Sequence, residues 1–201
     1  MTPEEIREIR NIQHNIDSIF INRWSPRAFT GQPVSQEDLM AILEAGRLAP
    51  SCANSQPWRF IYGHRMNEDW NSLFELLVPA NQEWVKHGAV LLLILSKRLD
   101  DKGRESGTQS FDTGAAWGFM ALEAYRRGTP LHGMAGFDYE KAKEKFQLGD
   151  DYKPEAMAVL GIVGHLEDLS EKNRAREKPS TRKSIDDISI NANRASDLLA
   201  R

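Results

Sequence analysis

Two arginines lie four positions apart around a hydroxyl group in the sequence RWSPR, residues 23–27. Arg23 and Arg27 carry planar, permanently charged donors that suit a phosphate, or a ring carbonyl that carries negative charge. Ser25 adds a hydroxyl, and Trp24 is expected to fill the core, since tryptophan is highly buried on average. Arginine side chains that cap the C-terminus of a helix would explain the segment equally well, so both interpretations stay open.

A polar loop occupies residues 48–60, with the sequence LAPSCANSQPWRF. Ser51, Asn54 and Gln56 offer hydroxyl and amide groups that donate and accept hydrogen bonds, and prolines such as Pro50 stiffen the chain. These groups suit a ligand with a ribityl-like chain or an imide edge. A tight turn whose side chains cap their own backbone would explain one or two of these residues, but not the whole run.

A third candidate combines a turn with a basic tail. The turn HGMAG, residues 132–136, contains two glycines, so Ala135 and Gly136 can aim backbone N–H groups at a ligand. Arg182 and Lys183 in the tail can supply cationic cover for a phosphate. Each feature alone is common in proteins that bind nothing there. The turn and the tail therefore indicate a ligand site only in combination with the first two segments.

Composition and missing motifs exclude several other kinds of protein. The 201 residues are 40% hydrophobic and 27% charged with a net charge of −3, which permits a buried core and gives no reason to expect a nucleic-acid partner. The sequence has no P-loop, GxGxxG, HExxH or GxSxG motif. Its five histidines lack the spacing of metal ligands, and we expect them at the surface or in capping roles. We therefore expect neither a metal site nor a catalytic dyad of side chains.

The single cysteine, Cys52, excludes an intramolecular disulfide and favours a reducing, cytoplasmic location. We expect it to be a small buried residue and not a redox group. The acidic, amphipathic start of the chain differs from a secretory signal. The longest strongly apolar run, residues 89–95, is too short to span a bilayer, so no membrane partner is expected.

Hydrophobic periodicity predicts one layered domain over residues 1–201, with a basic C-terminal arm over about 170–201. Residues 89–96 are apolar on both faces, which indicates a central strand covered by helices on each side. Small residues at 111–125 allow a close helix contact, either inside the core or across a subunit interface. Helices are predicted at 6–16, between Ser35 and Pro50, at 70–77, 111–125 and 139–146, with Pro79 expected to stop the helix at 70–77. Strands are predicted at 58–62, 89–96, near 131 and at 157–163.

Taken in this order and spacing, the segments resemble the FMN-dependent nitroreductase family. APSxxNxQPW is the most specific part of the resemblance, which extends from about residue 16 to residue 188. It implies an α+β fold in which helices flank a mixed central β-sheet in three layers, assembled as an intertwined homodimer. The matching stretches are RWSPRAF (23–29), APSCANSQPWRF (49–60), Asn81, GMAGFD (133–138) and TRKSIDDI (181–188).

The resemblance also implies a cofactor and a reaction. FMN would lie between the subunits and carry hydride from NAD(P)H to a nitroaromatic, quinone or similar planar acceptor by a ping-pong route. Reduction places negative charge on the N1–C2–O2 edge of the flavin, where Arg27 would stabilise it. The implied cofactor-binding residues are Arg23, Trp24, Ser25, Arg27, Pro50, Ser51, Asn54, Gln56, Asn81, Ala135, Gly136, Arg182 and Lys183.

Each segment is assigned a part of the cofactor by this resemblance. Arg23 and Ser25 would hold the phosphate and ribityl region, and Arg182 and Lys183 would clamp the phosphate. Asn81 would face the pyrimidine edge. The polar loop would reach the same cofactor from the other subunit, and the glycine-containing turn would direct its backbone N–H groups toward N5 and O4.

Three other functions stay open at this point. The chain could belong to a specialised branch of the family, such as a reductive dehalogenase or a flavin-fragmenting enzyme, with residues 99–109 as a lid over the substrate. It could be a flavin-binding protein without turnover, or a dimeric scaffold without a cofactor. Trp24 stands where many relatives carry a second arginine, and Met134 where some carry an acidic residue, which leaves the acceptor open.

Overall fold

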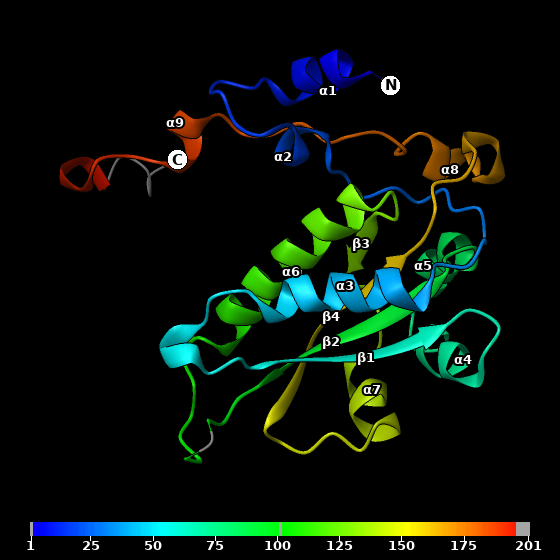
Figure 1. The fold of residues 1–201 in the computed structure, drawn as a ribbon, viewed down its shortest axis with the longest axis vertical. Helices are drawn as coiled ribbons and strands as arrows, with labels where there is room; N and C mark the ends of the chain where they lie inside the picture. The colour runs from blue at the N-terminus through cyan, green and yellow to red at the C-terminus, as the bar shows by residue number, and fades with distance from the viewer. Residues whose placement is uncertain (1, 101, 196–201) are drawn as a thin grey trace. The chain divides into compact units, whose positions relative to one another are not determined.

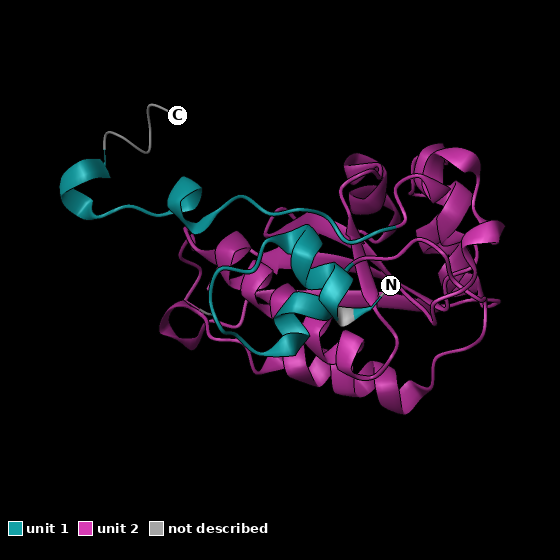
Figure 2. Cartoon of the chain, turned by 90° about the horizontal axis from the view of Figure 1, so that it is seen from above, with its two compact units in different colours: residues 1–24, 178–201 teal, residues 25–177 magenta. Residues whose placement is uncertain are grey.

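A computed structural model describes residues 2–100 and 102–195 of the chain. It divides them into two compact units, shown separately in Figure 2. The larger unit is residues 25–177, and the smaller one comprises the described parts of 1–24 and 178–201. The single domain expected over the whole chain stays a prediction.

The larger unit is built on a four-stranded sheet in the order β1-β2-β4-β3, so β1 and β3 are its edge strands. The sequence predicted a mixed sheet, but every strand pairing among the described residues is antiparallel. A parallel pairing would need a further strand that these residues do not supply. The strands are β1 (Trp58–His64), β2 (Val90–Lys97), β3 (Leu131–Met134) and β4 (Tyr152–Leu160).

Helices cover both faces of the sheet, as the apolar sequence of β2 predicts (Figure 1). Leu93 and its alternate neighbours pack with α4, α5 and α7, whereas Leu92 and its alternate neighbours pack with α3 and α6. Each of these buried leucines stabilises the fold by about 1.5 to 3 kcal/mol. The helices are α3 (Gln36–Arg47), α4 (Glu68–Phe74), α5 (Pro79–Val85), α6 (Gln109–Arg126) and α7 (Tyr139–Lys145).

Two predicted boundaries differ from the structure. Pro79 was expected to stop a helix, but it begins α5, because a proline needs no N–H partner in the first turn. The preceding helix, α4, ends at Phe74 instead of residue 77. Strand β4 begins at Tyr152, well before the apolar run at 157–163, because backbone pairing with β2 extends it through polar residues.

The larger unit continues beyond β4 through the short helices η2 (Leu166–Asp168) and α8 (Glu171–Arg174) as far as residue 177. The basic arm predicted from about residue 170 therefore begins with a segment that belongs to the larger unit. Asn173 anchors this segment, because its side chain is only 4% exposed.

The smaller unit brings together segments from the two ends of the chain. Its first helix, α1 (Pro3–Arg10), ends sooner than predicted, because Asn11 adopts a left-handed conformation that terminates it. The backbone N–H of Ile185 donates to Oε1 of Gln13 at 2.7 Å, which ties the C-terminal segment to the N-terminal one. Its other helices are α2 (Ser18–Asn22), α9 (Ile185–Ile188) and η3 (Ala192–Arg194). No helix in the described part of the chain is long and apolar enough to cross a membrane.

Candidate functional site

Two hollows lie along the edge strand β3, and both are lined by Gly133, Met134 and Ala135. We call them the polar hollow and the apolar hollow. The polar hollow has a volume of about 320 Å³, and the apolar hollow about 360 Å³. The residues that line the polar hollow include Arg27, Asn81, Trp84, His132, Ala135 and Gly136.

Arg27 supplies positive charge to the polar hollow. Its guanidinium lies over the ring of Trp84, 5.7 Å from the centroid, which gives a cation–π contact. Its backbone N–H donates to the Glu177 carboxylate at 2.9 Å, so the position of the residue is fixed through its main chain. Burial and the nearby Arg176 lower the pKa of Arg27, and Glu177 opposes the shift.

Asn81 and Gly136 meet across the polar hollow. Nδ2 of Asn81 donates to the backbone oxygen of Gly136 at 3.0 Å. A Cβ at position 136 would lie 2.6 Å from that nitrogen, so a larger residue would displace the Asn81 side chain from its present position. The contact joins α5 to the end of β3.

The backbone N–H groups of Ala135 and Gly136 have no acceptor among the described residues, although both residues line the polar hollow. Ala135 is exposed and Gly136 is half-buried, so these N–H groups are open to solvent or to a ligand in the hollow. Together with Arg27 and the Asn81 amide, they form a set of donors that suits a planar ligand with acceptor atoms along one edge.

His132 also lines the polar hollow, and no sequence pattern singled it out. Its Nδ1 lies 2.7 Å from the backbone oxygen of Pro26, next to Arg27, and its ring packs 4.6 Å from that of Trp84. The residue was expected at the surface or at a helix cap, but it is only 9% exposed. The sequence signal that could have placed this histidine at the hollow was its membership of the glycine-containing turn at 132–136.

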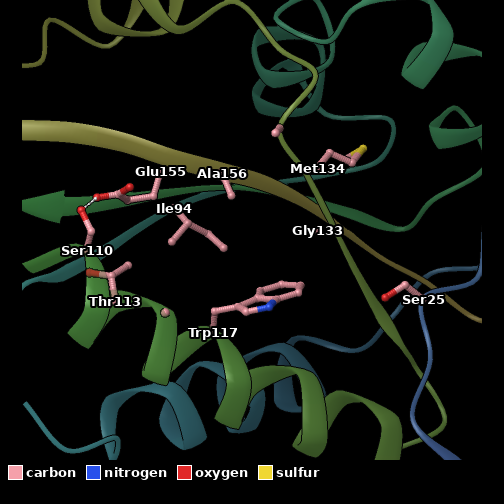
Figure 3. A pocket seen from close by; sticks show the side chains of 11 residues that line it. Ser25, Ile94, Ser110, Thr113, Trp117, Gly133, Met134, Glu155 and Ala156 are labelled. Carbon is pink, nitrogen blue, oxygen red and sulfur yellow. Dashed lines mark hydrogen bonds between the residues drawn. The ribbon is translucent and has the colours of Figure 1, made fainter. Parts of the chain in front are cut away.

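Figure 3 shows the apolar hollow, which opens between β3, β4 and α6. Ile94 and Met134 line it, and the ring of Trp117 reaches across it toward β3. Ser25 lies at one side, so this residue of the first motif does reach a cavity. An aromatic ring and aliphatic side chains favour the hydrophobic part of a ligand.

Glu155 closes the other end of the apolar hollow with a polar cluster. Its carboxylate accepts hydrogen bonds from the hydroxyl groups of Ser96 and Ser110, both at 2.6 Å, and from Nζ of Lys153 at 3.0 Å. Burial would raise the pKa of Glu155, but donation by these groups lowers it overall. The carboxylate is therefore held in its charged form.

The polar loop lies at the other end of the larger unit. It follows the C-terminal end of α3, far from α5 (Figure 1). None of Pro50, Ser51, Asn54 or Gln56 lines either hollow. Within one chain, the structure therefore does not bring these four predicted residues together with Arg27.

The conformation of the polar loop is strained and well anchored. Ala53, Asn54 and Gln56 have φ values of 48°, 57° and 47°, a left-handed region that costs about 1 to 2 kcal/mol for each residue with a side chain. The backbone N–H of Cys52 donates to the buried carboxylate of Asp112 at 3.2 Å. Cys52 itself is exposed, so the prediction of a buried filler is wrong.

The remaining predicted residues belong to the smaller unit, which holds Arg23, Trp24, Arg182 and Lys183. Burial and the nearby Arg182 lower the pKa of Arg23. Trp24 is half-buried and not part of a hydrophobic core cluster. These residues are described within their own unit only, so their predicted roles at a phosphate are not tested.

Arg10 joins this group of cations, although no motif pointed to it. Its guanidinium donates to the backbone oxygens of Phe20 and Arg23 at 3.1 and 2.8 Å. Burial, with the charges of Arg182 and Arg23, lowers its pKa to about 10, so the side chain stays charged at neutral pH. Its buried Nε has no partner among the described residues. The mutual repulsion of these three arginines is the kind of arrangement that an anion stabilises.

The lid candidate at 99–109 does not approach either hollow. Leu99 and Glu105 form an isolated bridge, and the Arg104 guanidinium donates to Asp100 at 2.8 Å. None of the lining residues of the two hollows falls in the segment before Gln109. The structure therefore gives no support to a lid there.

The comparison with protein families identifies the class of this protein. The model of the nitroreductase family matches residues 21–165, and the chain belongs to that family. The α+β class predicted from the sequence, with helices on both faces of the sheet, is thereby confirmed.

Individual relatives agree with this assignment. A solved structure described as an oxidoreductase containing FMN is 39% identical, has a TM-score of 0.88, and covers 91% of this chain and 94% of its own. The major NAD(P)H-flavin oxidoreductase of Aliivibrio fischeri is 25% identical, covering 83% of this chain and 94% of that protein. A nitroreductase family protein from Clostridium difficile 630, 21% identical with a TM-score of 0.68 over 89% of this chain and 99% of its own, shares the fold.

Proposed function

We propose that this protein is an FMN-dependent oxidoreductase that uses NAD(P)H to reduce nitroaromatics, quinones or similar planar acceptors. The observation that carries the proposal is the pair of unpartnered N–H groups at Ala135 and Gly136, which line a hollow with Arg27 and Asn81. FMN, when bound, supplies the chemistry by accepting hydride from the nicotinamide and passing electrons to the acceptor. The names of the FMN-containing structure and of the Aliivibrio fischeri enzyme support this choice.

The two hollows fit the two ends of an isoalloxazine ring. Its pyrimidine end carries carbonyl and imide groups, which match the donors of the polar hollow. Its dimethylbenzene end is apolar, which matches Trp117, Ile94 and Met134 in the apolar hollow. Gly133 lines both hollows, and a Cβ there would lie 3.0 Å from the Trp117 ring, so glycine leaves room between them.

Each residue then has a definite task. Arg27 stabilises negative charge on the N1–C2–O2 edge, and the N–H groups of Ala135 and Gly136 donate toward N5 and O4. Asn81 holds the pyrimidine edge through its amide. Within the smaller unit, the cations Arg10, Arg23, Arg182 and Lys183 are suited to binding a phosphate. Within the larger unit, Ser25 is assigned to the ribityl chain.

We further propose that two chains form the complete site. The polar loop is held in a strained conformation but reaches neither hollow of its own chain, so its Ser51, Asn54 and Gln56 would contact FMN bound to the partner. One face of α6 is available for the interface, because Phe111 is 81% exposed and a Cβ added at Gly114 or Gly118 would meet nothing within 4 Å. The small residues of this helix were expected to allow a close contact either inside the core or across a subunit interface. The exposed, open face of α6 favours the subunit interface.

The same site would serve the nicotinamide and the acceptor in turn, which is a ping-pong sequence. A site whose selectivity comes from stacking on a flat ring accepts many planar electrophiles. A cytoplasmic location, which the single cysteine favours, gives access to reduced nicotinamides.

The test is a visible spectrum of the purified protein, followed by anaerobic addition of NADH or NADPH. We expect flavin absorption bands that the reduced nicotinamide bleaches and that a planar acceptor, such as a benzoquinone, restores. A protein that stays colourless after incubation with FMN would overturn the proposal. Bands that neither nicotinamide bleaches would instead identify a flavin-binding protein without turnover.

A further inference from the structure

Lys172 and Arg176 line the polar hollow beside Arg27. Both belong to the segment around α8, which lies beyond residue 165, where the match to the nitroreductase family ends. The family match therefore assigns these two cations no role. Both cations add positive charge to the hollow.

The segment around α8 is held firmly in place. Arg174 donates to the backbone oxygens of Glu167 and Leu169 at 3.2 and 3.1 Å, and the buried Asn173 anchors the helix. Lys172 and Arg176, one turn apart on this anchored segment, are exposed and reach the hollow. Their position follows from the packing of α8 and not from a mobile tail.

Glu177 connects this segment to the first motif. Its carboxylate accepts the backbone N–H groups of Arg27 and Ala28 at 2.9 and 3.0 Å. Nη1 of Arg27 also donates to the backbone oxygen of Arg176 at 3.4 Å. Residues 149 positions apart are thereby held side by side, with two arginines next to one another.

The charge of this arrangement is unbalanced. No ion pair among the described residues includes Arg27, Lys172 or Arg176. The positive charge of Arg176 adds to burial in lowering the pKa of Arg27. Glu83 also lines the hollow but forms no ion pair with these cations, and the Glu177 carboxylate already accepts two backbone N–H groups. Glu177 offsets part of the repulsion between the adjacent cations, since its charge raises the pKa of Arg27, and an anionic group between the cations would lower the remaining cost.

We propose that Arg176 is a second cation for the group that Arg27 holds, so that the two guanidinium groups together bind the pyrimidine edge of the flavin and favour its reduced form. Lys172 adds a weaker, more distant charge of the same sign. The inference rests on the proposed function, since it assigns residues to the same cofactor. It extends that function by making the segment around α8 part of the flavin site.

The test compares the reduction potential of the FMN-loaded protein with that of the Arg176→Gln variant, measured by equilibration with a reference dye. Loss of the charge should weaken binding of reduced FMN relative to oxidised FMN by about threefold to tenfold. A tenfold change corresponds to about 30 mV for a two-electron couple, so the potential should fall by about 15 to 30 mV. Arg176→Lys should keep most of the wild-type potential, because it keeps the charge.

Arg126→Gln is the matched control. Arg126 is an exposed arginine on α6 that pairs with Glu123 and lines neither hollow, so its loss changes the net charge equally but should leave the potential unchanged. If the wild-type protein binds FMN and NAD(P)H bleaches it, but Arg176→Gln shifts the potential no more than Arg126→Gln does, the inference fails and the proposed function stands. If the wild-type protein binds no FMN, both fail.

Discussion

The region around β3 forms two hollows within one chain, whereas the polar loop contributes to neither of them. Around β3, Arg27, Asn81 and the turn at 135–136 meet in one hollow, although they are distant in the sequence. The polar loop has comparable hydrogen-bonding groups and an anchored backbone, but it lines neither of the two hollows of its own chain. This difference is the basis for our proposal that the β3 region binds the cofactor and that the loop contributes to the site of a partner chain.

The largest effect is expected from breaking the proposed subunit interface, which should separate the polar loop of one chain from the β3 region of the other. Phe111→Asp places a charge on α6 at a position that is 81% exposed, so the isolated chain should keep its stability. Burying that charge in a dimer would cost on the order of 3 kcal/mol, or about a hundredfold in the dissociation constant. We expect a monomer that loses FMN, measured by light scattering and by the flavin absorption of the eluted protein.

Met66→Asp is the control for that variant, because Met66 is 85% exposed and lies outside α6. It should leave both the assembly and the FMN content unchanged. A Phe111→Asp protein that stays dimeric, or that is monomeric with full FMN, would show that α6 does not complete the site.

Mixed dimers can establish whether the polar loop acts on the partner. Arg27→Ala damages the β3 region, and Asn54→Gly with Gln56→Gly removes loop side chains while glycine still allows the positive φ of both positions. If the loop acts across the interface, one of the two sites in a mixed dimer has no substitution. We expect mixed dimers, prepared with two different affinity tags, to bind one FMN tightly per dimer. Two equally weakened sites would instead place the loop at the FMN of its own chain.

Gly136→Ala should destabilise the β3 region itself. The added Cβ would lie 2.6 Å from Nδ2 of Asn81 and would disturb its 3.0 Å hydrogen bond to the Gly136 oxygen. The free energy of unfolding should fall by about 1 to 3 kcal/mol, measured by urea denaturation. Gly107→Ala is the control, because a Cβ there meets nothing within 4 Å. If the two variants were equally stable, the Asn81 side chain would tolerate a Cβ at position 136.

Arg27→Ala by itself should have the smallest effect: the homodimeric variant should bind FMN more weakly, and at saturating FMN the change should appear in the reduction potential of the cofactor. Loss of this cation should lower the flavin potential by about 30 mV, a tenfold change for two electrons, and slow reduction by NAD(P)H. Arg27→Lys should restore most of the potential, since it keeps a positive charge. Unchanged reduction with full FMN occupancy in Arg27→Ala would remove Arg27 from the pyrimidine edge.

Local signals explain which parts of the fold could be predicted. Helix α3 was predicted well because Ser35 caps it, accepting from the Asp38 N–H at 3.0 Å, and its apolar spacing is regular. Strand β2 was predicted because it is apolar on both faces. Helix α5 was missed, since Pro79 was interpreted as a stop. The same residue type fits the first turn of a helix, and only the packing of Trp84 in the core distinguishes the two cases.

The sequence by itself determined the family resemblance, the layered α+β class and the chemical character of the candidate site residues, because each depends on residue types within short segments. Only the tertiary structure decided that Arg27, Asn81, Ala135 and Gly136 share a hollow, that Arg176, just after α8, lines the same hollow, and that the polar loop lies apart. Those outcomes depend on contacts between distant segments, such as the Glu177 carboxylate on the backbone of Arg27. No local pattern encodes such a contact, because its free energy exists only once the sheet and its helices have packed.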